Sequence, residues 1–218
     1  MITKYRLGLP IFLAALTLVS GVAPRLLAHD SRLVGTATVE STIEQAAATA
    51  HEVALTVDVT KSKVNFTLGS TLHTVHGIFA LKHGAIRIEP DGKASGEIVA
   101  DATSGQSGDS GRDKKMHKDV LESPKFTEVV FRPDRVDGKI PASGAVSVQM
   151  HGMFALHGSE HEMTVPVTGE VNGDHWSGKT TLKIPYVAWG LKSPNTFLLK
   201  ADPVVEVELE LVGTIDAH

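Results

Sequence analysis

The sequence contains no cysteine in its 218 residues. A disulfide framework is therefore excluded, as is lipid attachment at an N-terminal cysteine. After the first 28 residues the chain also lacks an apolar run of roughly 20 residues, so no membrane span is predicted there. The folded protein must be stabilised by its packed core alone.

The first 28 residues have the parts of a secretory signal peptide. Lys4 and Arg6 provide the positive start, residues 7–23 are apolar or small, and Leu26-Leu27-Ala28 provides a cleavage site before His29. The alternative is a retained membrane anchor, but prolines and hydroxyl side chains interrupt a run that would have to be about 20 residues long. We predict a signal peptide over residues 1–28 and a periplasmic or secreted protein.

Positive charge is scarce once this segment is removed. Lys4, Arg6 and Arg25 are lost with it and no acidic residue is, so the formal net charge changes from −4 to −7, with 18 basic against 25 acidic residues. This charge argues against nucleic acid as a partner, because neutralising phosphates requires a concentrated basic surface. The roughly 190 residues that remain suit one domain.

The composition changes near residue 53. Residues 29–52 are rich in Ala, Thr, Ser and Glu and contain no aromatic residue. They predict a flexible N-terminal extension, with a short helix over residues 38–50 as the alternative. From Val53 onward the hydrophobic period is two, which indicates half-buried strands. A single barrel domain is predicted over residues 53–215.

The alternation is clearest near the C-terminus, where Glu206, Glu208 and Glu210 interleave with apolar residues. It recurs at Val53, Leu55, Val57 and Val59, at Val64, Phe66 and Leu68, at Val146, Val148 and Met150, and at Met163, Val165 and Val167. Turn signals such as Asp91-Gly92 and Asn172-Gly173 separate the runs at hairpin spacing. The pattern predicts an all-β antiparallel sandwich or barrel rather than a parallel sheet.

A short internal repeat adds detail. Residues 76–81 (His-Gly-Ile-Phe-Ala-Leu) match residues 151–156 (His-Gly-Met-Phe-Ala-Leu) at five of six positions. A glycine inside a strand marks a bend or a close approach to the backbone, so Gly77 and Gly152 are candidate corners of a closing barrel. The phenylalanine and leucine of each repeat are then predicted to point inward, and His76 and His151 outward.

One segment interrupts the β pattern. Residues 104–111 predict a flexible loop, and residues 112–121 a short helix with Met116, Val120 and Leu121 on its apolar edge. Its other faces carry a basic cluster of Lys114, Lys115, His117 and Lys118. Two interpretations stay open: contact with phosphate head groups or an anionic membrane surface, or simply a solvated face.

The same segment carries a family resemblance. Residues 111–126 (Gly-Arg-Asp-Lys-Lys-Met-His-Lys-Asp-Val-Leu-Glu-Ser-Pro-Lys-Phe), followed by Val129-Val130-Phe131, resemble the Arg-Asp…Met/His…Leu…Phe…Phe signature of the YceI-like proteins. Residues 75–79 resemble that family's early Val-x-Gly-x-Phe strand, and residues 146–167 its long hairpin. The resemblance covers residues 53–213. It implies an elongated, lipocalin-like antiparallel β-barrel with one short helix, located in the periplasm, with a polyisoprenoid chain threaded along its core.

The chain departs from the family pattern at one place. The family often carries an arginine followed by an acidic or aromatic residue and glycine near the penultimate strand, whereas residues 186–192 here read Tyr-Val-Ala-Trp-Gly-Leu-Lys. The arginine is missing. Lys192 or the basic helix would have to replace it at the polar end of a ligand.

The alternation also defines an inner face. A barrel of about eight strands is just wide enough to be filled by side chains or to hold one slim ligand. The candidate ligand-binding residues are Phe66, Leu68, Phe79, Leu81, Phe131, Val148, Met150, Phe154, Leu156, Met163, Val165, Trp176 and Leu182, with Val129 and Ile184 completing the lining. This face carries no charge, so it suits hydrocarbon, which it buries at roughly 0.8 kcal/mol per CH₂.

Competing chemistry finds little support in the sequence. Eleven histidines invite a metal hypothesis, yet the chain has no His-Glu-x-x-His motif. His73 and His76 fall on opposite faces of a strand unless a turn intervenes, whereas His157 and His161 flank a tight turn and could approach each other. Residues 108–111 (Gly-Asp-Ser-Gly) resemble a serine-protease loop but lack its context. No glycine-rich phosphate loop follows a strand. No cofactor and no catalytic residue are predicted.

The sequence thus predicts a non-enzymatic periplasmic carrier or sequestering protein for a polyisoprenoid-type lipid or an isoprenoid quinone. Transient contact with a membrane surface is compatible with the basic helix. A self-filled barrel that serves as an interaction or stress-response module is the alternative, and an enzyme acting on a lipid is a third. The oligomeric state stays open.

Overall fold

The computed structural model describes residues 52–217, which belong to a single compact unit. The predicted signal peptide of residues 1–28 and the extension of residues 29–52 lie outside these residues, apart from Glu52. Within the described part of the chain, no helix is long and apolar enough to cross a membrane.

The described residues form ten strands and one helical segment. The strands are β1 (Val53–Val57), β2 (Lys63–Leu68), β3 (Val75–Phe79), β4 (Leu81–Ile88), β5 (Ala94–Asp101), β6 (Glu128–Asp137), β7 (Gly144–Leu156), β8 (Ser159–Asn172), β9 (His175–Ile184) and β10 (Val205–Ala217). The helical segment is α1 (Ser110–Lys115), continued by the π-helical turn η1 (Met116–Val120).

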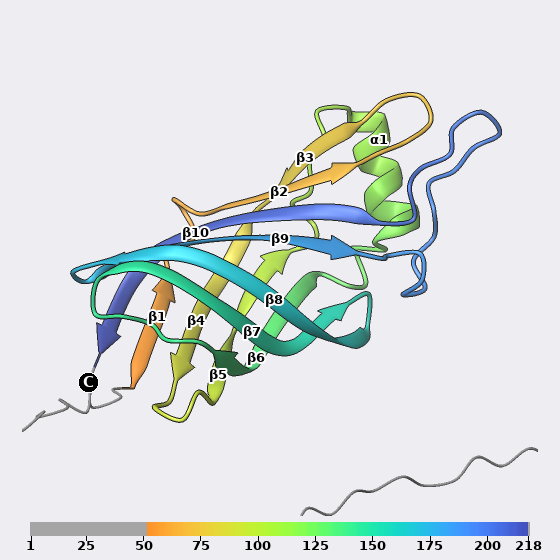
Figure 1. Cartoon of the computed structure of the whole chain (residues 1–218). Coiled ribbons are helices and arrows are strands. Elements are labelled where there is room, and N and C mark those ends of the chain that lie inside the picture. The colour runs from red at the N-terminus through yellow and green to blue at the C-terminus, as the bar shows by residue number, and fades with distance from the viewer. Residues whose placement is uncertain (1–51, 218) are drawn as a thin grey trace, which may run out of the picture. The chain divides into compact units, whose positions relative to one another are not determined.

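Antiparallel pairing closes these strands into a barrel (Figure 1). Eight strands pair in the ring β1-β4-β5-β6-β7-β8-β9-β10, and β10 returns to β1 with Val53 opposite Ala217 and Val57 opposite Gly213. The remaining two, β2 and β3, extend the ring, because β2 pairs with β10 beyond β1 and β3 pairs with β2. The predicted all-β antiparallel barrel of about eight strands with one short helix is therefore confirmed.

A turn of residues 58–62 separates β1 from β2 along β10. The Asp58 carboxylate accepts hydrogen bonds from the Thr60 amide (3.0 Å) and hydroxyl (2.6 Å) and pairs with Lys61 (3.0 Å). These contacts, the Thr60 hydrogen bond first, lower the pKa of Asp58 to about 2. The alternation of β1 ends at Val57, so Val59 lies in this turn rather than in the strand.

The side chains alternate as the period of two predicts. Glu206 and Glu208 are exposed on the outside of β10, and Glu210 pairs there with Lys179. Leu211 is buried on the opposite face, within the core. The predicted register of the last strand is confirmed, and a slip of one residue would have inverted it.

The two repeated glycines allow close approaches, but at different places. A side chain on Gly152 would overlap the Arg132 carbonyl, where β6 has a bulge between Pro133 and Arg135. A side chain on Gly77 would overlap the Phe66 ring and the Gln106 carbonyl. Each glycine of the repeat is therefore required for a different close contact.

The helical segment begins two residues before its predicted start. Asp109 caps α1 by accepting from the Arg112 amide (2.7 Å), and the π-helical turn follows, with the Leu121 amide donating to the Met116 carbonyl (2.9 Å). The loop before it, predicted to be flexible, is hydrogen-bonded into the fold. Its residue Gln106 exchanges backbone hydrogen bonds with Ile78 of β3 (2.8 and 3.0 Å).

The pairing of β8 with β9, which we call the seam of the barrel, covers only part of each strand. β8 and β9 pair from Thr168–Lys179 to Asn172–His175, and the remaining length of each strand has no partner on that side. Trp189, from the segment of residues 185–204 between β9 and β10, packs here. Trp189 stacks on His161 of β8 at 3.9 Å between ring centroids and lies 5.8 Å from Phe154. The seam is thus covered by side chains rather than by backbone pairing.

Candidate lipid-binding cavity

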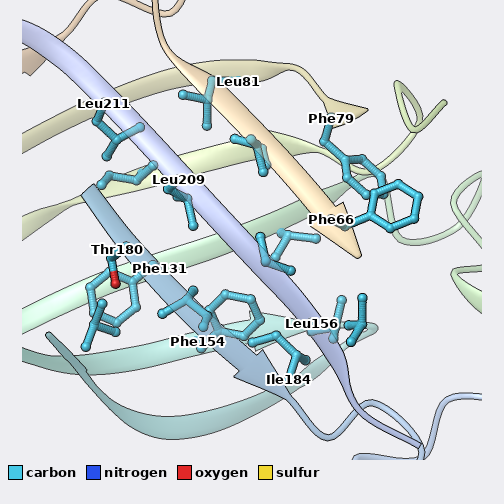
Figure 2. Close-up of a pocket in the computed structure, with 18 of the residues that line it drawn as sticks. Phe66, Phe79, Leu81, Phe131, Phe154, Leu156, Thr180, Ile184, Leu209 and Leu211 are labelled. Atoms are coloured by element: carbon cyan, nitrogen blue, oxygen red, sulfur yellow. The ribbon is translucent and has the colours of Figure 1, made fainter. Parts of the chain in front are cut away.

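A cavity of about 620 Å³ occupies the barrel interior. This volume lies within the usual range for small-molecule sites. Every strand of the barrel contributes to its wall, as do the helical segment and residues 185–204. Figure 2 shows side chains such as Phe66, Phe131, Phe154 and Leu209 converging on the same space. The wall is almost entirely hydrocarbon, so the cavity suits an apolar occupant and repels a hydrated one.

All but one of the residues predicted for the inner face line this cavity. The predicted residues that line the cavity are Phe66, Leu68, Phe79, Leu81, Val129, Phe131, Val148, Met150, Phe154, Leu156, Val165, Trp176, Leu182 and Ile184. Met163 does not line it. It packs half-buried against the core from the stretch of β8 that has no β9 partner.

Several lining residues were absent from the predicted inner face. They include Leu55, Val64, Val75, Ile86, Ile98, Val205, Val207, Leu209 and Leu211, together with Met116, Val120 and Leu121 of the helical edge. The signal for most of them was present, because they occupy alternate positions of strands whose period is two. The helical edge was also predicted as apolar, but local periodicity does not say what that edge covers.

One polar atom lies deep in this wall. Thr180 points inward from β9, and its hydroxyl oxygen stands among carbon atoms in Figure 2. The oxygen is buried and has no hydrogen-bond partner in the described structure. An unpaired buried hydroxyl is costly, so this position favours an occupant that can accept or donate one hydrogen bond.

The cavity has a polar end beside the helical segment. Arg112 and Lys115 line it, and both side chains bond to neutral oxygens. Arg112 donates to the Ser107 hydroxyl and carbonyl (2.7 Å each), and Lys115 to the Pro194 carbonyl (3.1 Å). Neither forms an ion pair within residues 52–217. We call this end the mouth: Ser70, His73, Ser107, Arg112, Lys115, Pro194, Thr196 and Leu199.

The structure shows which cations lie near the cavity in place of the arginine that is missing from residues 186–192. Lys192 is mostly exposed, lies 4.0 Å from Glu122 and does not line the cavity. The basic helix, by contrast, places two cations at the mouth. Tyr186 also lines the cavity, donates to the Asp202 carbonyl (2.8 Å), and has its pKa raised, chiefly by burial.

The histidines have separate roles. His157 bonds to Glu122 (2.7 Å), His151 to Asp137 (2.8 Å), and His117 to Ser123 (2.9 Å) and the Gly105 carbonyl (2.9 Å). Across residues 52–217, no three His, Asp or Glu side chains gather closely enough to hold a metal ion. His76 and His151 lie on the outer face, as predicted.

The Gly-Asp-Ser-Gly segment also has a structural role. Asp109 is the N-cap of α1, and Ser110 is its first residue. The acidic group thus satisfies an amide at the helix start, which would otherwise lack a partner.

Comparison with known proteins identifies the fold. The model of the YceI-like domain matches residues 55–213. The crystal structure of Burkholderia cenocepacia BcnA is similar with a TM-score of 0.59 and 20% identity, over 72% of this chain and 99% of that one. A polyisoprenoid-binding domain from Saccharophagus degradans, implicated in plant cell wall breakdown, is similar with a TM-score of 0.57 and 16% identity, over 75% and 98%. No curated protein matches the chain.

Proposed function

This chain belongs to the family of YceI-like domain proteins, and we propose that it binds a long apolar lipid, a polyisoprenoid or an isoprenoid quinone, inside its barrel. It acts as a carrier or sequestering protein after export to the periplasm. The observation that carries the proposal is the apolar cavity of about 620 Å³. The similarity to a polyisoprenoid-binding domain supports the class of ligand.

The length of the ligand follows from energetics. Burying hydrocarbon contributes about 0.8 kcal/mol per CH₂, or roughly 3–4 kcal/mol for each isoprene unit. Association costs about 4–15 kcal/mol in lost freedom. A single unit therefore does not bind, whereas a chain of several units does. The wall can supply this energy because it offers the chain almost no competing polar group.

The orientation we propose for the ligand is based on the two cations at the mouth. Arg112 and Lys115 are held at the mouth by neutral oxygens, which leaves their charge available to a polar or anionic head group. The chain then extends past Phe79 and Phe66 toward the interior. Thr180 supplies one further hydrogen bond at depth, which a quinone ring could use and a plain hydrocarbon could not.

The experiment is native mass spectrometry of protein purified from its own host. We expect an extra mass that organic extraction identifies as a polyisoprenoid-type lipid. The same spectrum gives the N-terminus, which we expect near His29. An intact Met1 on protein from the native compartment would contradict export with cleavage.

The variant Leu156→Trp decides whether the wall residues contact that lipid. Leu156 lines the cavity and is 8% exposed. In a hollow barrel the added ring enters ligand space, so bound lipid should fall sharply while the melting temperature changes little. Overpacking a filled core would instead cost about 1–3 kcal/mol.

The matched control is Gln149→Trp, on the exposed face of the same strand, which should keep the full lipid load. If Leu156→Trp carries as much lipid as the parent, Leu156 does not line the site. If its melting temperature falls, the barrel is self-filled.

A further inference from the structure

Three large apolar side chains are exposed on two neighbouring loops. Leu72 is 65% exposed, Phe197 96% and Leu198 74%. Leu72 lies between β2 and β3, and the other two lie in the segment between β9 and β10. Single exposed leucines are common on protein surfaces, but a cluster that includes an almost fully exposed phenylalanine marks an interaction site.

The two loops are hydrogen-bonded to each other. The Thr71 amide donates to the Lys200 carbonyl (2.9 Å), and the Lys200 amide donates to the Thr71 hydroxyl (3.2 Å). Ser70 and Ala201 form an isolated β-bridge beside them. The exposed apolar side chains therefore lie on two loops that are held together by backbone hydrogen bonds.

Each loop also has internal hydrogen bonds that hold its tip. The Ser70 hydroxyl donates to the His73 carbonyl (2.6 Å), around Leu72. The Thr196 amide donates to the Leu199 carbonyl (2.9 Å), and the Leu199 amide to the Thr196 hydroxyl (3.1 Å), around Phe197 and Leu198. Both tips are tight turns whose apolar side chains are exposed to solvent.

These loops also form the mouth of the cavity. Ser70, His73, Thr196 and Leu199 line it, within one or two residues of an exposed side chain. Figure 1 shows both loops at the end of the barrel that carries α1. A surface that contacts Phe197 and Leu198 is therefore next to the polar end of the cavity.

The helical segment adds positive charge at this end. Basic residues outnumber acidic ones along α1 and η1, with Arg112, Lys114, Lys115 and Lys118 against Asp113 and Asp119. Asp113 accepts from the Ser107 amide (2.8 Å), and Lys114 and Lys118 are exposed. Lys200 is exposed beside the apolar tips, with Asp202 nearby. Acidic residues otherwise predominate, since the chain after residue 28 has 25 acidic against 18 basic residues.

We propose that this end of the barrel docks on the surface of an anionic lipid bilayer. Leu72, Phe197 and Leu198 enter the interface, and Lys114, Lys118 and Lys200 meet the head groups. Apolar side chains bury at the boundary of head groups and acyl chains, and lysines near an anionic surface add to the binding. The inference deepens the proposed function, since docking would open the mouth onto the membrane. It rests on that function only for the passage of lipid.

The test is flotation of the exported protein with large unilamellar vesicles. One set contains phosphatidylglycerol and phosphatidylethanolamine, and the other only phosphatidylcholine. We expect binding to the anionic vesicles that weakens as salt is raised. The double variant Phe197→Ser/Leu198→Ser should lower the partition at least tenfold, because each fully buried side chain contributes about tenfold to hundredfold. Lys114→Gln/Lys118→Gln should lower it about fivefold or more at low salt.

Ile78→Ser is the matched control, because Ile78 is 54% exposed on the outer face of β3 and not on either tip. It should bind like the parent. Equal binding by the parent and the double variant would overturn the proposal, as would an absence of anionic vesicle binding. So would a concentration-dependent dimer of the parent that the double variant loses, since the tips would then contact a second copy of the chain.

The outcomes separate docking from cargo binding. A double variant that still carries lipid but does not dock supports the docking surface and leaves the proposed function intact. A parent that docks and carries no lipid contradicts the proposed function but not the docking surface.

Discussion

Gly152 shows how one missing side chain sets the path of two strands. β7 passes so close to the bulge of β6 that a methyl group on Gly152 would overlap the Arg132 carbonyl. Gly152→Ala must therefore push backbone away, and we expect a loss of about 1–3 kcal/mol in the free energy of unfolding. Denaturant titration measures it.

Gly111→Ala provides the comparison at this scale. Gly111 lies in α1, and an added methyl group would meet nothing nearer than an Asp109 carboxylate oxygen at 3.4 Å. Replacing a helical glycine should stabilise by about 0.4–1 kcal/mol. Equal effects of the two substitutions would show that the approach at Gly152 does not constrain the strands.

Residue-level prediction succeeded where local period decides the outcome. The inward positions of Phe66, Val148 and Val165 follow from alternation alone, because successive side chains of a strand point to opposite faces. Thr180 and Met163 obey the same alternation, but alternation did not predict that Thr180 lines the cavity and that Met163 does not. Whether an inward side chain meets open space or a neighbour depends on elements far away in the sequence.

The seam between β8 and β9 is closed by an element that has no regular structure. Trp189 stacks on His161 and approaches Phe154, so it fills the space that a strand pairing would otherwise occupy. Trp189→Ala should open this side of the cavity to water. We expect a loss of about 2–4 kcal/mol in the free energy of unfolding. This is slightly less than for a fully buried ring, because Trp189 is only partly buried.

Bound lipid should fall together with stability in Trp189→Ala, as measured by denaturant titration and lipid extraction. Trp189→Phe keeps a ring in the seam and should restore most of both. If Trp189→Ala binds lipid as tightly as the parent, the seam is not part of the cavity wall.

Element-level prediction was weaker at ends and joins. The helix over residues 112–121 was found, but its start at Ser110 depends on the Asp109 cap and its second half is a π-helical turn. The segment 104–111 was predicted to be flexible because of its glycines and serines. Its bonds to Ile78 and Asp113 involve partners that composition does not reveal.

Closure of the whole barrel depends on the pairing of β1 with β10, which joins the two ends of the described chain. Alternation predicted an antiparallel sandwich or barrel and left the choice open, because a local period carries no information about which distant strands pair. The resemblance to a family supplied the barrel. The Asp58 turn, which lets β1 and β2 follow one another along β10, was not predicted either.

A hollow barrel should gain stability from its cargo as a whole. A ligand that binds only the folded state stabilises it by about 2.7 kcal/mol at a concentration one hundred times its Kd. For a domain of this size each kcal/mol raises the melting temperature by about 2–4 °C. Delipidated protein should therefore melt roughly 5–10 °C below protein resaturated with its extracted lipid. Scanning calorimetry over a series of lipid concentrations measures the shift.

Leu156→Trp serves as the control for this shift, because its ring fills part of the cavity and should make the melting temperature insensitive to added lipid. The wild-type shift should also grow with the logarithm of lipid concentration, as expected for binding to the folded state. If delipidated and resaturated wild-type proteins melt at the same temperature at every concentration, the lipid does not bind the folded barrel. The side chains around the 620 Å³ space would then have to be packing against one another in solution.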